Sequence, residues 1–305
     1  MSIIEHTSLS ITDFFKSLQN DICTSLELTD GKSKFREDAW ERPGGGGGLS
    51  RIITNGNIFE KGGVNYSAVF GKTPEIIAKS FDLPEKSEFY ATGLSIVIHP
   101  FNPHIPIIHS NIRYFELDNG VKWFGGGIDL TPIYIIEDDA RFFHQSLKHV
   151  CDSFSPDYYP RFRKWADDYF YITHRKETRG IGGIFFDRLR EDENCTFANR
   201  FEFVKQVGNC FVPVYTEIVK RNHYRNYNDK EKQWQLLRRG RYVEFNLIYD
   251  KGTRFGLDTD GRVESILMSL PAVAGWEYNY VPKKGSAEEK TLKLLRKDVQ
   301  WSYEL

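Results

Sequence analysis

The sequence predicts an α+β fold: a large, mostly antiparallel β-sheet flanked by α-helices on both sides, in a single domain over residues 1–305. Three observations lead to this prediction. Candidate strands follow one another at hairpin-sized intervals, and the helical patterns cluster after them. Strands and helices do not alternate strictly, as a doubly wound parallel sheet requires. No internal repeat and no Pro/Ser-rich linker divides the chain.

The elements are predicted in order along the chain. A helix over 10–28 begins after a cap at Ser10 and carries apolar residues at helical spacing. The glycine-rich stretch 35–71 predicts loop and hairpin, and strands are then predicted over 90–98, 106–116 and 121–128. Helices are predicted over 137–153, 159–172, 199–221 and 229–238. The alternating segment 241–249 (RYVEFNLIY) predicts a strand, with turn and strand structure through 270 and a last helix over 287–298.

Composition excludes several function classes. Apolar residues make up 40% and charged residues 27%, with a formal net charge of −1, so no basic field predicts nucleic-acid binding. The longest apolar runs are too short for a membrane span. Four scattered cysteines predict free thiols in a reducing compartment, and the first residues lack a signal or transit pattern, so we expect a cytoplasmic protein.

The predicted strand 106–116 places polar side chains in a row. With a period of two, one face carries Ile107, His109, Asn111, Arg113 and Phe115. A row of His, Asn and Arg between apolar ends is unusual for a core face. Arginine also suits carboxylate ligands, because its planar fork can bond both oxygens.

The turn Asp118-Asn119-Gly120 predicts a hairpin into KWFGGGID (122–129), and two registers are open. A two-residue loop sends Asp129 to the face opposite His109. A three-residue loop, with Gly120 in the left-handed conformation, places Asp129 across from His109. We favour the second register, because the glycines at 125–127 then leave open floor for a flat ligand. In the alternative interpretation the three glycines form a twisted strand end, and Asp129 caps the next turn.

Several long blocks resemble the oxygen-dependent coproporphyrinogen III oxidases of haem biosynthesis. They include FREDAWERPGGGGGLSRI (35–52), GVNYSAVFG (63–71), HPFNPHIPIIHSNIRYFE (99–116), WFGGGIDLTP (123–132), YYPRFRKWADDYFYITHRKETRGIGGIFFD (158–187), RRGRYVEFNLIYDKGTRFGL (238–257) and GRVESILMSLP (261–271). The resemblance implies aerobic oxidative decarboxylation of two propionates of coproporphyrinogen III to vinyls, giving protoporphyrinogen IX. O₂ is the co-substrate, CO₂ and H₂O₂ leave, and no cofactor is required. It also implies a homodimer, with a contact region at about 241–278.

The resemblance assigns roles to particular residues. It implies that Asp129 is the general base and His109 the proton donor, while Arg113 holds a propionate. Further substrate contacts are implied at Ser95, Asn111, Ile112, Asp260, Gly261 and Arg262. Ordinary structural roles for Ser95, for Arg262 and for the His–Asp pair stay open. Because burial raises the pKa of Asp129 and Arg113 lowers it, we predict no net pKa shift.

The resemblance also implies a possible divalent-metal set of four histidines, although their spacing is not compact: His99, His109, His144 and His174. His144 also fits a core edge, and His174 fits a helix end. The glycine run 42–48 matches no P-loop pattern and predicts a mobile loop near the pocket, or a plain connection. Two other functions stay open: a metal-dependent oxidase that uses the four histidines, and a tetrapyrrole carrier without turnover.

Overall fold

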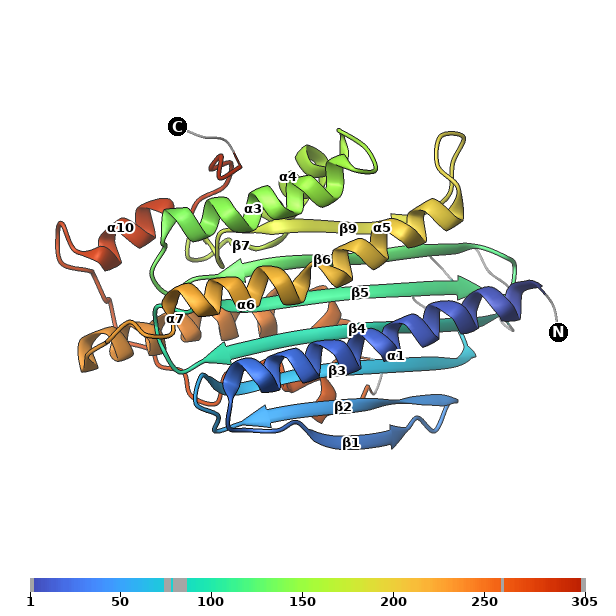
Figure 1. Ribbon diagram of the computed structural model, residues 1–305, viewed down its shortest axis with the longest axis horizontal. Helices are drawn as coiled ribbons and strands as arrows, with labels where there is room; N and C mark the ends of the chain where they lie inside the picture. Colours follow the sequence, from blue (N-terminus) through green and yellow to red (C-terminus); the bar gives the residue numbers. More distant parts are fainter. Residues whose placement is uncertain (1–2, 74–77, 79–86, 259–260, 303–305) are drawn as a thin grey trace.

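The structure, a computed structural model, describes residues 3–73, 78, 87–258 and 261–302. A seven-stranded sheet in the order β1-β2-β3-β4-β5-β6-β9 is antiparallel throughout (Figure 1). Its strands are β1 (Arg36–Glu41), β2 (Gly46–Thr54), β3 (Phe59–Lys72), β4 (Glu88–Pro100), β5 (Ile107–Leu117), β6 (Lys122–Thr131) and β9 (Gly183–Leu189). A two-stranded ladder pairs β7 (Tyr171–Ile172) with β8 (Glu177–Thr178).

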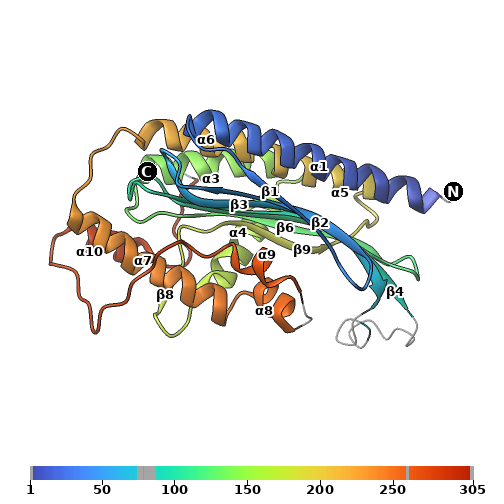
Figure 2. The same cartoon turned by 90° about the horizontal axis from the view of Figure 1, so that it is seen from below.

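Helices cover both faces of the sheet, which confirms the predicted fold class (Figure 2). One face is covered by α1 (Ile3–Asp30), α3 (Glu137–Asp152), α5 (Phe197–Asn209) and α6 (Phe211–Asn222). On the other side lie α4 (Tyr158–Tyr169), α7 (Asp229–Ile248), α8 (Lys251–Asp258), α9 (Val263–Leu267) and α10 (Ala287–Leu294). The main core fills the first interface, where Phe15 of α1 and Val207 of α5 pack with Ile108 and Ile112 of β5. The second face is less completely filled and carries the polar row of β5.

Several predicted elements are wrong or misplaced. The segment 241–249 is not a strand but the second half of α7, because Tyr242, Phe245 and Asn246 are buried at the three- and four-residue spacing of a helix. The expected turn and strand material up to 270 contains α8 and α9 instead. Ser10 lies inside α1 and does not cap it, since no proline or glycine interrupts residues 3–9.

Boundaries also differ from the predictions elsewhere in the chain. The helix predicted over 199–221 breaks at Cys210 into α5 and α6, and α10 ends at Leu294. Strand β9 has no counterpart in the prediction. The glycine run 42–48 is only in part a loop: Arg42 donates its backbone N–H to Gly46, residues 46–48 pair with β3, and residues 47–48 also pair with β1.

The favoured hairpin register is confirmed. The backbone N–H of Leu117 donates to Val121 at 2.8 Å, and Gly120 has φ +83°, the left-handed conformation that glycine adopts readily. Counting outward, Arg113 lies across from Gly125 and His109 lies across from Asp129. The three-residue turn therefore decides which face receives the carboxylate of Asp129.

Candidate active site

The candidate site lies on the face of the sheet that is flanked by α7 and α9 (Figure 2). Along β5, Ile108, Ser110 and Ile112 are buried in the core on the opposite face, whereas His109 and Asn111 are half-buried. Because successive side chains of a strand point to opposite faces, the predicted polar row exists and is only partly covered. It provides hydrogen-bonding groups on a surface that a ligand can reach.

His109 and Asp129 form a direct pair across β5 and β6. The Nδ1 atom of His109 lies 2.7 Å from the Oδ1 atom of Asp129. The Asp129 side chain is only 3% exposed, whereas that of His109 is 22% exposed. His109 is therefore the member of the pair that faces the open space, and Asp129 lies behind it.

Arg179 is the third member of this cluster, and it was not among the site residues predicted from the sequence. Its Nη2 atom donates to the Oδ2 atom of Asp129 at 2.5 Å, and its Nη1 atom donates to the side-chain oxygen of Asn246 at 2.9 Å. The local sequence TRGIGG allows this approach, since a Cβ at Gly180 would lie 2.2 Å from the carbonyl oxygen of Leu130. The sequence signal that could have pointed to Arg179 is its place directly before the glycines at 180, 182 and 183.

The pKa of Asp129 differs from the prediction that burial and a neighbouring cation would cancel. Burial alone would raise it, but the charge of Arg179 and the hydrogen bond from His109 more than offset the burial, so the pKa is lowered. The prediction of no net shift was wrong because it took Arg113 as the neighbouring cation. Arg179 is the cation that contacts Asp129, so this carboxyl group is ionised at neutral pH.

Arg113 is held at the edge of the open floor. Its Nη1 atom donates to Asn111 at 2.8 Å, and its Nη2 atom donates to Asp187 of β9 at 2.9 Å. A Cβ at Gly125 would lie 2.6 Å from the Oδ1 atom of Asp187 and 2.7 Å from the Nε atom of Arg113. Glycine at 125 therefore makes room for the Arg113–Asp187 pair, whereas Gly126 faces the core beside Phe186.

This geometry predicts different effects for two neighbouring glycines. Gly125→Ala is expected to displace Arg113 and to raise the KM for a carboxylate substrate about tenfold. This is the effect expected when one charge-assisted hydrogen bond is weakened. Gly126→Ala is the control, because its Cβ would meet Phe186 in the core. It is expected to lower the free energy of unfolding and leave KM unchanged. Steady-state kinetics and urea denaturation check both, and an unchanged KM for Gly125→Ala contradicts the assignment.

A polar row continues from Asn111 across the sheet. In register order the residues opposite one another are Asn111, Ser95, Asn65, Ser50 and Asp38. Arg262, at the start of α9, lies over the far end and donates to Asp38 at 2.5 Å. Four strand spacings separate β5 from β1, roughly 19 Å. The row therefore has an arginine near each end and the predicted Ser95 between them. Its far half is covered by α9, because Ser265 bonds the Ser50 hydroxyl and accepts from the Asn65 side chain.

Of the remaining predicted contacts, Ile112 lies away from the polar row. The Ile112 side chain is 1% exposed in the core on the opposite face, so it cannot face a ligand on the polar row. Asp260 lies outside the described residues. Gly261 donates its backbone N–H to Gly256 at 2.7 Å and directly precedes Arg262.

Comparison with known proteins identifies the family. The profile described as coproporphyrinogen III oxidase matches residues 10–301. The chain belongs to the coproporphyrinogen III oxidase family. It is 51% identical over 297 residues to the oxygen-dependent coproporphyrinogen-III oxidase of Drosophila melanogaster, covering 93% of this chain and 75% of that one. Two chloroplastic relatives, from Glycine max and Arabidopsis thaliana, are each 47% identical over 300 residues, covering 94% of this chain and 77% of theirs.

The four histidines of the possible metal set have separate partners in this coproporphyrinogen oxidase family member. His144 is fully buried and bonds Tyr159 and the carbonyl of Ile181. The other three contact different groups: His99 the carbonyl of Ser269, His109 Asp129, and His174 Tyr249 and Glu244. Within the described part of the chain, no three His, Cys, Asp or Glu side chains are grouped to hold a metal ion. These residues therefore do not fit a four-histidine metal site.

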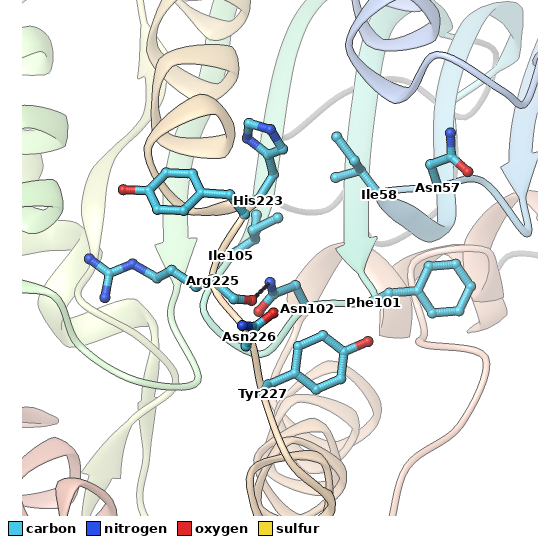
Figure 3. Close-up of a pocket in the computed structure, with 10 residues that line it drawn as sticks. Asn57, Ile58, Phe101, Asn102, Ile105, His223, Arg225, Asn226 and Tyr227 are labelled. Atoms are coloured by element: carbon cyan, nitrogen blue, oxygen red, sulfur yellow. Dashed lines mark hydrogen bonds between the residues drawn. The ribbon is translucent and has the colours of Figure 1, made fainter.

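A separate cavity of about 280 Å³ lies where the β4–β5 connection meets the α6–α7 connection (Figure 3). Asn102 and Tyr227 line it, and the Asn102 side chain donates to the carbonyl of Arg225. None of the predicted site residues lines this cavity.

In the described ranges no helix is long and apolar enough to cross a membrane.

Proposed function

We propose that this protein is an oxygen-dependent coproporphyrinogen III oxidase that converts two propionates of its substrate to vinyls, giving protoporphyrinogen IX. The observation that carries the proposal is the half-buried polar floor at Asn111 and Arg113 of β5, with the His109–Asp129 pair beside it. Arg262 lies at the far end of the row, past the part that α9 covers. Family membership and the printed names of the relatives support the same reaction.

The two arginines provide carboxylate recognition. Each now bonds one half-exposed aspartate, Arg113 with Asp187 and Arg262 with Asp38. A substrate propionate offers the same two oxygens as these aspartates, so it can take up arginine N–H groups that the aspartates leave free. We propose that Asn111 and Ser95 donate further hydrogen bonds to a tetrapyrrole seated over β4 and β5, beside Arg113.

The His109–Asp129 pair provides proton transfer. Conversion of each propionate to a vinyl releases CO₂, two electrons and two protons in total when the acid is counted in its protonated form. O₂ takes up two electrons and two protons and leaves as H₂O₂. We propose that His109, which faces the floor, exchanges a proton with the substrate, while the buried Asp129 supports it from behind. The resemblance implied direct roles for both residues, Asp129 as general base and His109 as proton donor, and this proposal keeps the direct role for His109 alone.

The test is an anaerobic mixture of the protein with coproporphyrinogen III, followed by addition of O₂. The proposal expects protoporphyrinogen IX and two molecules of CO₂ per substrate, formed only after O₂ is added, with or without a chelator. Loss of activity with chelator favours the metal-dependent oxidase. Binding without product favours the carrier. Loss of activity with chelator contradicts turnover without a cofactor, and binding without product contradicts the proposed reaction.

A homodimer and a cytoplasmic location belong to the same proposal. Exposed apolar side chains gather on α7, α8 and the segments after them, including Leu247, Ile248, Phe255, Val263 and Trp276. A patch of this kind is typical of an interface. It falls within the expected contact region 241–278, although that region is helical. Sedimentation equilibrium measures the mass directly, and a monomer at micromolar concentration contradicts the dimer. Fractionation of the cells of origin tests the location.

A further inference from the structure

Arg179 is a buried arginine whose ion pair, among the described residues, is with Asp129. Its side chain is 2% exposed, and Asp129 is equally enclosed at 3%. Burying two charges is costly unless their geometry and hydrogen bonds compensate. Other arginines of the chain are also buried with a carboxylate, for example Arg238 with Glu177, but the partner of Arg179 is the aspartate that bonds His109.

Three aromatic rings surround the guanidinium of Arg179. Its central carbon lies 4.3 Å from the ring centroid of Phe170 and 4.7 Å from those of Tyr242 and Phe245. Asn246 accepts from one end, and the backbone N–H of Arg179 donates to the carbonyl of Phe170. Cation–π contacts and hydrogen bonds together leave the guanidinium little freedom to move.

Two titratable groups face Asp129 besides Arg179: His109 on β5 and Tyr242 on α7. Asp250, just after the end of α7, interacts electrostatically with Arg179, and Arg179 interacts in the same way with His99 of β4. An ionised Asp129 has no hydrogen to donate, so the Nδ1 atom of His109 must carry the hydrogen of their bond. The Nε2 atom is then the ring nitrogen left for a ligand.

We propose that Arg179 is a positioning residue for proton transfer: it anchors the Asp129 carboxylate, which holds His109 in the tautomer that presents Nε2 to the substrate. This inference rests on the proposed function. Arg179 itself does not touch the substrate floor, because Asp129 lies between it and His109. The proton is exchanged between His109 Nε2 and the substrate, and Asp129 stays ionised throughout.

The test compares Arg179→Gln with the conservative Arg179→Lys. For Arg179→Gln we expect kcat to fall about 100-fold with KM nearly unchanged, because the histidine loses its orientation. Without the Arg179 charge, burial raises the pKa of Asp129. The acid limb of the profile of kcat against pH therefore moves to higher pH by about 1–3 units. Arg179→Lys retains the charge and is expected to keep this limb within about one pH unit of wild type.

Arg238→Gln is the matched control, because Arg238 is also a buried arginine but its carboxylate partner is Glu177 and not Asp129. It is expected to leave the pH profile unchanged. A second readout needs no substrate: ¹⁵N NMR of labelled histidine, with His109→Gln to assign the signal. We expect hydrogen on Nδ1 in wild type and mixed tautomers in Arg179→Gln. Unchanged tautomers and an unchanged acid limb overturn the inference, whereas inactive wild type with the expected tautomers contradicts only the proposed function.

Discussion

Replacing Asp129 by asparagine is expected to lower kcat at least about 100-fold while KM changes little. The substitution keeps the shape of the side chain but removes the charge that accepts a hydrogen bond from His109 and pairs with Arg179. It also leaves Arg179 buried without a carboxylate, so the free energy of unfolding should fall by about 3–5 kcal/mol. Turnover of coproporphyrinogen III and urea denaturation measure the two effects.

Asp139→Asn is the control for this substitution. Asp139 is another buried aspartate that bonds a neighbouring amide, Asn222, but it lies on α3 against the opposite face of the sheet. It is expected to retain wild-type kcat. Near-normal turnover by Asp129→Asn, at a pH where the protein is folded, would remove Asp129 from the proposed mechanism.

Replacing Arg113 by glutamine is expected to raise KM about 10- to 100-fold, because a charge-assisted hydrogen bond to a carboxylate contributes about 1.5–3 kcal/mol. Stability should change little, since Arg113 is 36% exposed and its pair with Asp187 is accessible to solvent. The measurement is the dependence of rate on coproporphyrinogen III concentration at saturating O₂.

Arg221→Gln is matched to this substitution. Arg221 has the same exposed fraction, 36%, and pairs with an accessible carboxylate on Glu217, but it lies on α6 over the other face of the sheet. Its KM should stay at the wild-type value. If both variants shift KM alike, Arg113 has no special role in holding the propionate.

Local signals in the sequence predicted the hairpin and its register correctly. Asn119-Gly120 indicates a tight turn with two possible registers, and the glycines at 125–127 favour the one that brings His109 to Asp129. The prediction of a strand over 241–249, the second half of α7, was wrong for the opposite reason. RYVEFNLIY satisfies a two-residue and a helical period at once, and only packing of Tyr242 and Phe245 against neighbours decides between them.

Long-range contacts explain what the sequence analysis missed. Arg179 lies 50 residues from Asp129, and no periodic pattern connects the two positions. The Asp187 partner of Arg113 lies on β9, a strand that was not predicted, 74 residues away. The Asp38–Arg262 contact spans 224 residues. Such pairs depend on how strands and helices are arranged in space, which spacing along the chain does not encode.

The most direct test of the account is the crystallographic position of coproporphyrinogen III bound anaerobically to the protein. We predict the ring over Asn111 and Gly125, one propionate at Arg113 and the Nε2 atom of His109 facing the macrocycle. Substrate density in the cavity lined by Asn102 and Tyr227 (Figure 3), with the polar floor empty, would contradict it.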